Sequence, residues 1–381
     1  MSHPYEALPP DRFWRTAVAD RSPFDISGLW TPKFEVTKRS RIVTAGSCFA
    51  QHFSRALVAR GYRWLDCEPG PKGLTPEQRK DYHYGTFSFR TGNIYTPRML
   101  RQWLEWAFGG SEPPAEVWEK DGRLYDPFRP GVEPGGFASA EELAASRAVT
   151  LAAVQAAVQQ ANVLVFTLGL TESWQRREGG YEYAICPGTI AGRFDPEAHV
   201  FVNHDYRTLA QDMSVALRIL FRANRGLRVL LTVSPVPLTA TASGQHVLLA
   251  TSHSKSLLRA VAGQLAQDHA TVDYFPSYEI ITHPAYRGMF FAPNMRSVTQ
   301  AGVDFVMANF FRDQATAYPP PVRAPAGKAP PAGVPATGSA PQPVRAPAGK
   351  APVEPPPEPP SAEDSAAEIR CEEEILNAFS R

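Results

Sequence analysis

Residues 41–57 read R-I-V-T-A-G-S-C-F-A-Q-H-F-S-R-A-L, and within this run the pattern changes from that of a strand to that of a helix. The β-branched residues 42–44 favour a buried strand. Gly46 permits the backbone dihedral angles that a sharp turn needs. Phe49 and Phe53 then begin an apolar repeat at helical spacing. The run therefore predicts a strand, a tight turn and a helix.

Ser47 lies at the turn between this strand and this helix. In open α/β sheets, ligands bind beyond the carboxyl ends of the strands. A hydroxyl at this place also faces the positive end of the helix, which favours developing negative charge. Because serine is also a favoured helix cap, position alone leaves two interpretations of Ser47, a functional hydroxyl and an ordinary N-cap.

Short apolar runs typical of buried parallel strands recur along the chain and alternate with helical patterns. The expected strands lie at about 42–45, 163–167, 228–233 and 272–275. The main expected helices lie at about 96–108, 139–160, 206–223, 252–268 and 299–313. This alternation predicts an α/β fold with three α/β/α layers around a mainly parallel sheet. Residues 110–137 and 175–204 are expected to be irregular insertions, and residues 1–40 an arm that wraps the core.

The run Gly46-Ser47-Cys48-Phe49-Ala50 resembles the signature of the GSCFA family, within the wider group of SGNH/GDSL hydrolases. The resemblance covers roughly Ile26 to Arg312. It implies an SGNH/flavodoxin-like sheet with Ser47 as the nucleophile. It also implies a serine ester hydrolase or acyltransferase that acts through an acyl-enzyme, on an ester that is small or linked to a carbohydrate. The neighbouring Cys48 is a rival nucleophile, because a thiol at a helix N-terminus has a lowered pKa, but we expect it to be a buried packing residue.

The oxyanion of such a reaction needs hydrogen-bond donors. The backbone N–H of Ser47 is one candidate. The resemblance adds Gly92 and Asn93 from a second sequence block, although Gly92 is equally well explained as a turn glycine. It also adds Gly169 and Thr171 from a third block, where the family group usually has an asparagine in place of Thr171.

The general base is the largest departure from the SGNH pattern. The group has a D-x-x-H pair before its last helix, and this chain has Asn294 and Ser297 in those places. Neither side chain acts as a base near neutral pH. Arg296, between them, is a candidate for binding an anionic or other polar part of the substrate, together with Asn294 and Ser297.

Two histidines and one acid are candidates for the missing roles. His246 follows the predicted strand at 228–233 and is the first candidate for the base. His283 follows the last predicted strand and is the second. A lone histidine is also common in purely structural roles. Glu172 either orients the base or is a solvated loop acid.

The composition excludes several classes of function. The net charge of +1 makes nucleic acid an unexpected partner. The four cysteines contain no C-x-x-C pair, which argues against a zinc ribbon or a disulfide framework and fits a reducing compartment. No run resembles a signal peptide or a membrane span, and no nucleotide or metal motif is present. We therefore expect a cytoplasmic protein without metal or cofactor.

The prolines divide the chain into three parts. Residues 1–318 form the expected catalytic domain. Residues 319–361 contain the decapeptide P-V-R-A-P-A-G-K-A-P twice and are expected to be a disordered linker. Residues 362–381 predict a short acidic amphipathic helix, which would dock either a protein partner or the body of the same chain.

Two functions of different classes follow from these observations. The first is the serine ester hydrolase or acyltransferase. The second is a protein that keeps the fold but has lost the chemistry, and that binds a ligand or docks a partner. The replacement of the acid and the histidine by Asn294 and Ser297 is the reason to keep the second hypothesis.

Overall fold

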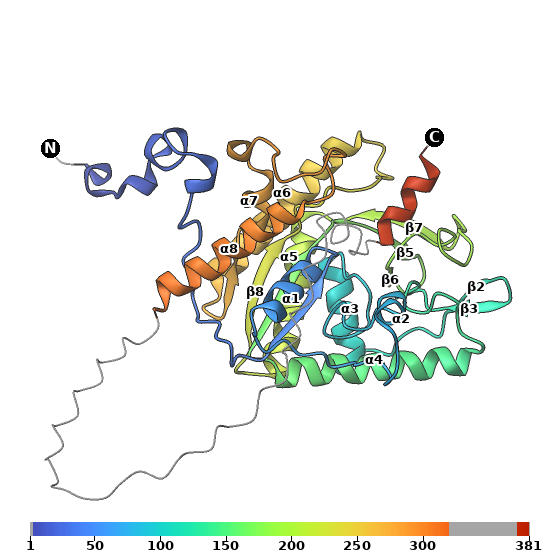
Figure 1. The fold of residues 1–381 in the computed structure, drawn as a ribbon. Helices are drawn as coiled ribbons and strands as arrows, with labels where there is room; N and C mark the ends of the chain where they lie inside the picture. The colour runs from blue at the N-terminus through green and yellow to red at the C-terminus, as the bar shows by residue number, and fades with distance from the viewer. Residues whose placement is uncertain (1–2, 320–371, 381) are drawn as a thin grey trace, which may run out of the picture.

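The computed structural model describes residues 3–319 and 372–380 (Figure 1). All four predicted strands are present and form one parallel sheet in the order β1-β4-β8-β9. They are β1 (Ile42–Gly46), β4 (Val163–Leu168), β8 (Arg228–Val233) and β9 (Val272–Tyr274). The predicted α/β fold with a parallel sheet is confirmed.

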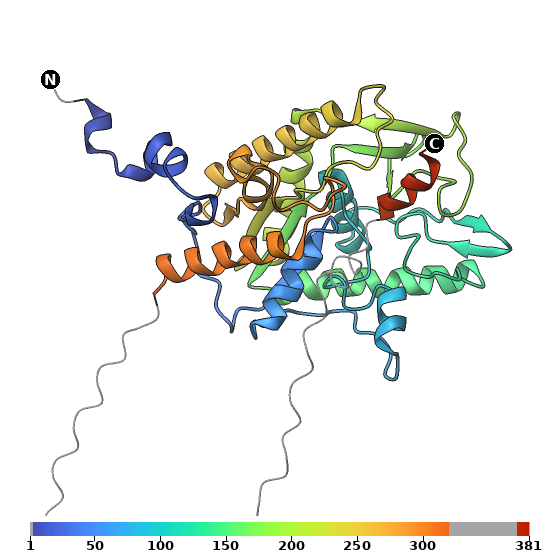
Figure 2. The same cartoon turned by 45° about the horizontal axis from the view of Figure 1, so that its top comes forward.

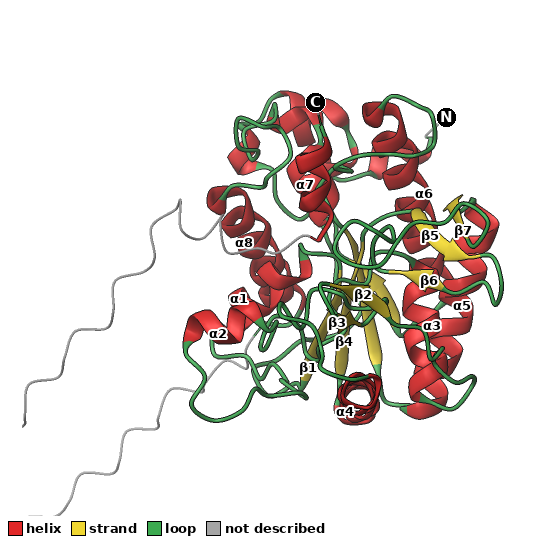
Figure 3. Ribbon diagram, turned by 90° about the vertical axis from the view of Figure 1, so that its right-hand side faces the viewer, coloured by secondary structure: helices red, strands yellow, loops and turns green. Residues whose placement is uncertain are grey.

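Helices cover both faces of this sheet (Figure 3). One face packs against α3 (Pro97–Ala107), α4 (Ala140–Gln160), α5 (Tyr206–Ala223) and α6 (Val247–Asp268). The other packs against α1 (Ala50–Ala59), α7 (Ser277–Thr282) and α8 (Gln300–Ala317). Each face of the sheet has its own hydrophobic core: the first lies under α3, α4, α5 and α6, and the second under α1, α7 and α8. Adjacent strand residues alternate between these cores, so Val43 belongs to the first and Ile42 to the second.

At β1, the direction in which successive strands are added to the sheet reverses. β4 pairs with one side of β1, and Trp64 forms an isolated parallel bridge to Ile42. The chain therefore runs from β1 to the Trp64 bridge and then returns across the sheet to β4. Ligand crevices in α/β sheets form at such switch points, beyond the carboxyl ends of the strands. Gly46 and Ser47 occupy this place.

The two segments expected to be irregular contain short antiparallel strands, so that prediction is wrong in part. Residues 110–137 include the hairpin of β2 (Trp118–Lys120) and β3 (Arg123–Tyr125). The second segment and its flanks form a sheet in the order β6-β5-β7, seen beside the main sheet in Figure 2. Its strands are β5 (Glu172–Arg176), β6 (Glu182–Tyr183) and β7 (His199–Asn203). These strands are too short and too mixed in polarity to give a clear period-two pattern.

The N-terminal arm wraps the second core as predicted, although only part of it is buried. Trp30 and Phe34 are buried in that core, whereas Trp14 is exposed. Short helical turns fill the rest of the arm and two later loops: η1 (Pro4–Ala7), η2 (Pro10–Arg12), η3 (Arg15–Ala19), η4 (Pro23–Asp25), α2 (Pro76–Asp81) and η5 (Pro284–Tyr286).

The C-terminal segment packs on the body of the chain. Residues 372–379 form the short 3-10 helix η6 (Glu372–Phe379), drawn in red in Figure 1 beside β5, β6 and β7. Ile375 contacts the first hydrophobic core. The predicted linker lies outside the described residues except for Pro319, as does the start of the predicted tail helix. Among the described residues, no helix is long and apolar enough to cross a membrane.

Candidate active site

Gly46 fixes how the end of β1 meets the end of β4. Its φ angle is +128°, a region that side-chain-bearing residues rarely adopt. A Cβ at this position would lie 2.3 Å from the carbonyl oxygen of Thr167. Only glycine allows this approach, and the turn that follows it presents Ser47.

Ser47 is not a helix cap. The helix α1 begins at Ala50, its N-cap is Phe49, and no side chain caps it. The side chain of Ser47 is buried, with 2% of the residue exposed, and its Oγ makes no hydrogen bond among the described residues. A buried hydroxyl without a partner is unfavourable, and such groups are often found where a ligand or a reaction supplies the partner. The N-cap interpretation is therefore wrong.

The second and third sequence blocks meet Ser47 through backbone contacts. The amide of Ile94 donates to the carbonyl of Gly46 at 2.8 Å, which brings Gly92 and the buried Asn93 to the turn. Gly92 has a φ of +69°, which explains the glycine at this turn. A Cβ on Gly169 would lie 2.9 Å from the Cβ of Ser47, so these two residues are in direct contact.

Lys255 reaches the same place from α6. Its Nζ donates to the carbonyl oxygen of Gly169 at 2.7 Å, and the residue is only 1% exposed. Burial lowers the pKa of Lys255 to about 7, Glu373 acts to raise it, and Arg296 acts to lower it further. An amine with this pKa is partly neutral at neutral pH and can accept a proton.

The sequence analysis missed Lys255, although a signal was present. In the helix at 252–268, Lys255 shares its spacing with the apolar Leu258 and Ala262, so it lies on the buried face. A single lysine on an apolar stripe is a charge that the fold must desolvate, and lysines of this kind are often functional.

Two of the expected oxyanion donors are used elsewhere. The amide of Ser47 donates to the carbonyl of Thr167 at 3.0 Å. The hydroxyl of Thr171 donates to Asn203 Oδ1 at 2.7 Å. Because both groups already donate to other oxygens, neither can donate to an oxyanion in this arrangement. The prediction that Ser47 N–H and Thr171 are oxyanion donors is therefore wrong. The amide of Gly92 makes no hydrogen bond within the described residues, and it remains a candidate donor beside Asn93.

The predicted histidines lie away from Ser47. The helix α6 starts at Val247, earlier than expected, so His246 is its exposed N-cap and accepts from the Leu248 amide at 3.2 Å. His246 precedes Lys255 by nine positions along the chain, a helical rise of about 13 Å. His283 caps η5 and its ring contacts Trp14 in the N-terminal arm. Neither histidine contacts the residues around Ser47 in the described part of the chain.

His52 on α1 is a further histidine near the turn that the sequence analysis did not consider. Its ring packs against Phe49. Burial, followed by the charge of Arg55, lowers the pKa of His52 to about 3. A histidine with so low a pKa is a weak base, so His52 is a poorer candidate than Lys255.

Asn294 and Ser297 form a small loop motif rather than a catalytic pair. Nδ2 of Asn294 donates to Oγ of Ser297 at 2.9 Å, and Oδ1 of Asn294 accepts from the backbone amides of Arg296 and Ser297. The motif holds the loop so that the side chain of Arg296 is largely buried, with 14% exposed. Arg296 lies 3.0 Å from Glu374 and 3.6 Å from Glu373, both on η6.

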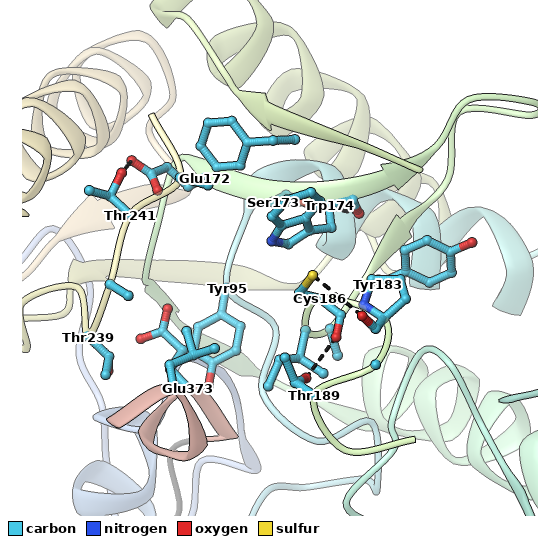
Figure 4. Close-up of a pocket in the computed structure, with 18 of the residues that line it drawn as sticks. Tyr95, Glu172, Ser173, Trp174, Tyr183, Cys186, Thr189, Thr239, Thr241 and Glu373 are labelled. Atoms are coloured by element: carbon cyan, nitrogen blue, oxygen red, sulfur yellow. Dashed lines mark hydrogen bonds between the residues drawn. The ribbon is translucent and has the colours of Figure 1, made fainter. Parts of the chain in front are cut away.

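A cavity of about 760 Å³ opens beside the site and is lined mainly by apolar side chains. Figure 4 shows Glu373 pointing from η6 toward Tyr95 and Thr239. Glu172 lies at another part of the wall and accepts a hydrogen bond from Thr241 at 2.7 Å. Burial raises the pKa of Glu172. Glu172 therefore borders the cavity, and no described contact joins it to Ser47 or Lys255.

Cys48 takes part in a disulfide bond. Its thiol is therefore not the nucleophile. The residue is buried, as expected, but the disulfide bond was not predicted. Cys67 and Cys186 are free, and Cys371 lies outside the described residues. Burial raises the pKa of both free thiols to about 11, so neither is activated.

Within residues 3–319 and 372–380, no group of three or more His, Cys, Asp or Glu side chains could hold a metal ion.

The comparison with known families agrees with the signature at the turn. The model of the GSCFA family matches residues 41–310, from the first strand to the last helix of the body. No curated protein matches the chain. Since the match covers well over half of the sequence, the chain belongs to the GSCFA family.

Proposed function

We propose that this protein is an SGNH-type serine ester hydrolase or acyltransferase, in which Ser47 is the nucleophile and Lys255 the general base. The observation that carries the proposal is the meeting of both residues at Gly169. Ser47 contacts Gly169 through its side chain, and the Nζ of Lys255 is 2.7 Å from the Gly169 carbonyl. A buried hydroxyl without a hydrogen bond and an amine with a pKa of about 7 are thus both neighbours of Gly169.

The reaction proceeds in two halves. Neutral Lys255 takes the hydroxyl proton of Ser47 while Oγ attacks the ester carbonyl carbon, and the carbonyl π electrons move to its oxygen. The intermediate then collapses, the bond to the leaving oxygen breaks, and the ammonium of Lys255 returns the proton to that oxygen. Water or an acceptor hydroxyl repeats the sequence on the acyl-enzyme, which gives hydrolysis or acyl transfer and restores Ser47.

Oxyanion stabilisation comes from the second sequence block in this scheme. The amide of Gly92 lies on the segment that Ile94 anchors to Gly46. Each well-placed donor of this kind contributes about 3–4 kcal/mol to the transition state. The positive end of α1 adds to the same field.

The adjacent cavity favours a substrate with a sizeable apolar part. Trp174, Phe194 and Phe201 stand in its wall, and rings of this size bury apolar or sugar faces equally well. The ester therefore has an acyl or alcohol part large enough to meet these rings, and a carbohydrate alcohol is one candidate.

Labelling with a fluorophosphonate probe tests the proposal. The purified full chain is expected to be labelled, and Ser47→Ala to be silent. Lys255→Met is expected to react at least 100-fold more slowly, the range typical for loss of a general base. Labelling that survives Ser47→Ala would exclude Ser47. A ligand-binding protein without chemistry would give no labelling in any variant.

A further inference from the structure

Among the described residues, Arg296 has no acidic partner from the body of the protein. In the described part of the chain, both carboxylates that pair with it, Glu373 and Glu374, come from η6. Its Nε and Nη2 are buried and make no hydrogen bond among these residues. A largely buried guanidinium needs an anionic partner, and among the described residues η6 supplies it.

The charges of Glu373 and Arg296 also act on Lys255. The carboxylate of Glu373 and the guanidinium of Arg296 act on it in opposite directions. The carboxylate of Glu373 therefore lies within electrostatic range of the amine that contacts Gly169. An anion held at Arg296 therefore acts electrostatically on Lys255.

The rest of η6 forms part of the cavity wall. Leu376 and Phe379 join Glu373 in lining it. Together they present one carboxylate at the Arg296 end and apolar side chains along the wall. A ligand that reaches from this mainly apolar cavity to Arg296, in place of Glu373, needs an apolar body and a carboxylate.

We propose that Arg296 forms a carboxylate-binding subsite next to Ser47 and Lys255, and that Glu373 fills it in this structure in place of a carboxylate-bearing ligand. The proposal rests on the proposed function, because it takes Ser47 and Lys255 as the catalytic residues. It assigns the substrate class, an ester with an anionic group and an apolar part. It also makes η6 a tethered competitor, because the segment and the ligand cannot occupy the subsite together.

Octanoate and octanamide are matched probes for this subsite, since they share the apolar chain and differ in charge. Their binding is measured by calorimetry on the full chain, on Glu373→Gln/Glu374→Gln, and on the same double variant with Arg296→Met. The exposed Glu119→Gln variant is the control for loss of an acidic residue. The double variant should bind octanoate at least 10-fold more tightly than the wild type, and at least 10-fold more tightly than octanamide. Adding Arg296→Met should remove the preference for octanoate.

Two results would overturn the proposal. Equal affinity for octanoate and octanamide would exclude a carboxylate subsite. Equal octanoate affinity in the wild type and in the double variant would exclude competition by η6. Fluorophosphonate labelling of the same proteins separates the two claims: octanoate binding without any labelling would remove the proposed function and leave the subsite in place.

Discussion

Replacing Lys255 by methionine should make the protein more stable while it loses its activity. The pKa of Lys255 falls from 10.5 to about 7 on burial. Since one pKa unit corresponds to about 1.4 kcal/mol, burial of this amine lowers the free energy of unfolding by about 4–5 kcal/mol at pH 7. Methionine has a similar length and no charge, and it also loses the hydrogen bond to Gly169, worth about 1.5 kcal/mol or somewhat more. We therefore expect Lys255→Met to raise the free energy of unfolding by about 3 kcal/mol at pH 7.

The pH dependence gives the sign of this effect independently. Between pH 7 and about 10, the unfolded chain keeps the proton of Lys255 while the native chain has released it. Because the unfolded state then binds more protons, this residue makes stability rise with pH, by about 2 kcal/mol between pH 7 and pH 9. The rise should be absent from Lys255→Met.

Urea unfolding at pH 7 and pH 9 measures both quantities. The exposed Lys120 on β2 provides the control, since Lys120→Met removes a lysine charge from the surface. The reasoning is refuted if Lys255→Met is less stable than the wild type at pH 7 and if their difference does not change with pH. That outcome would mean that Lys255 is a charged structural residue in the native protein.

Three further predictions concern the surroundings of the site. Gly169→Ala places a Cβ 2.9 Å from the Ser47 side chain, so it should lower stability by about 1–3 kcal/mol and slow fluorophosphonate labelling. Gly135→Ala, where a Cβ would have nothing within 4 Å, is the control and should have neither effect. Equal thermal unfolding and equal labelling of the two variants would contradict the contact. His246→Ala removes a helix cap and should lower stability by about 1 kcal/mol with labelling unchanged, and a large loss of labelling would restore His246 as the base. The labelling rate should increase with pH through about 7 and then level off as Lys255 loses its proton, so a flat profile would argue against this base.

The strands and the turn could be predicted because their signals are local. Residues 42–44 are β-branched, and Gly46 is required by a backbone contact with Thr167. The buried strands were equally clear, because strands covered on both faces are apolar throughout. The strands β5, β6 and β7 gave no such signal, since β6 has only two residues and most residues of β5 and β7 are only partly buried.

The missing base could not be found by looking for a substitute near the usual position in the sequence. Asn294 and Ser297 stand in the places of the acid and the histidine, and they hold a loop through hydrogen bonds to each other and to the backbone. The candidate that replaces them, Lys255, comes from a different helix and reaches Ser47 through Gly169. Contacts between such distant segments depend on the packing of α6 against the sheet, and single-sequence patterns do not contain that information.

The role of the C-terminal segment also depended on tertiary contacts. Its acidic and apolar pattern predicted a docking helix but left the docking site open. In the structure, η6 lies on the body of the same chain, with Glu373 and Glu374 beside Arg296. The acidic residues therefore meet a cation at the candidate site.

The most direct test of the account is fluorophosphonate labelling of four proteins: the wild type, Ser47→Ala, Lys255→Met and Glu373→Gln/Glu374→Gln. We expect labelling of the wild type, faster labelling of the double variant, none of Ser47→Ala and at least a 100-fold slower reaction of Lys255→Met. Labelling of Lys255→Met at the wild-type rate, or no labelling of either the wild type or the double variant, would contradict a serine nucleophile activated by this lysine.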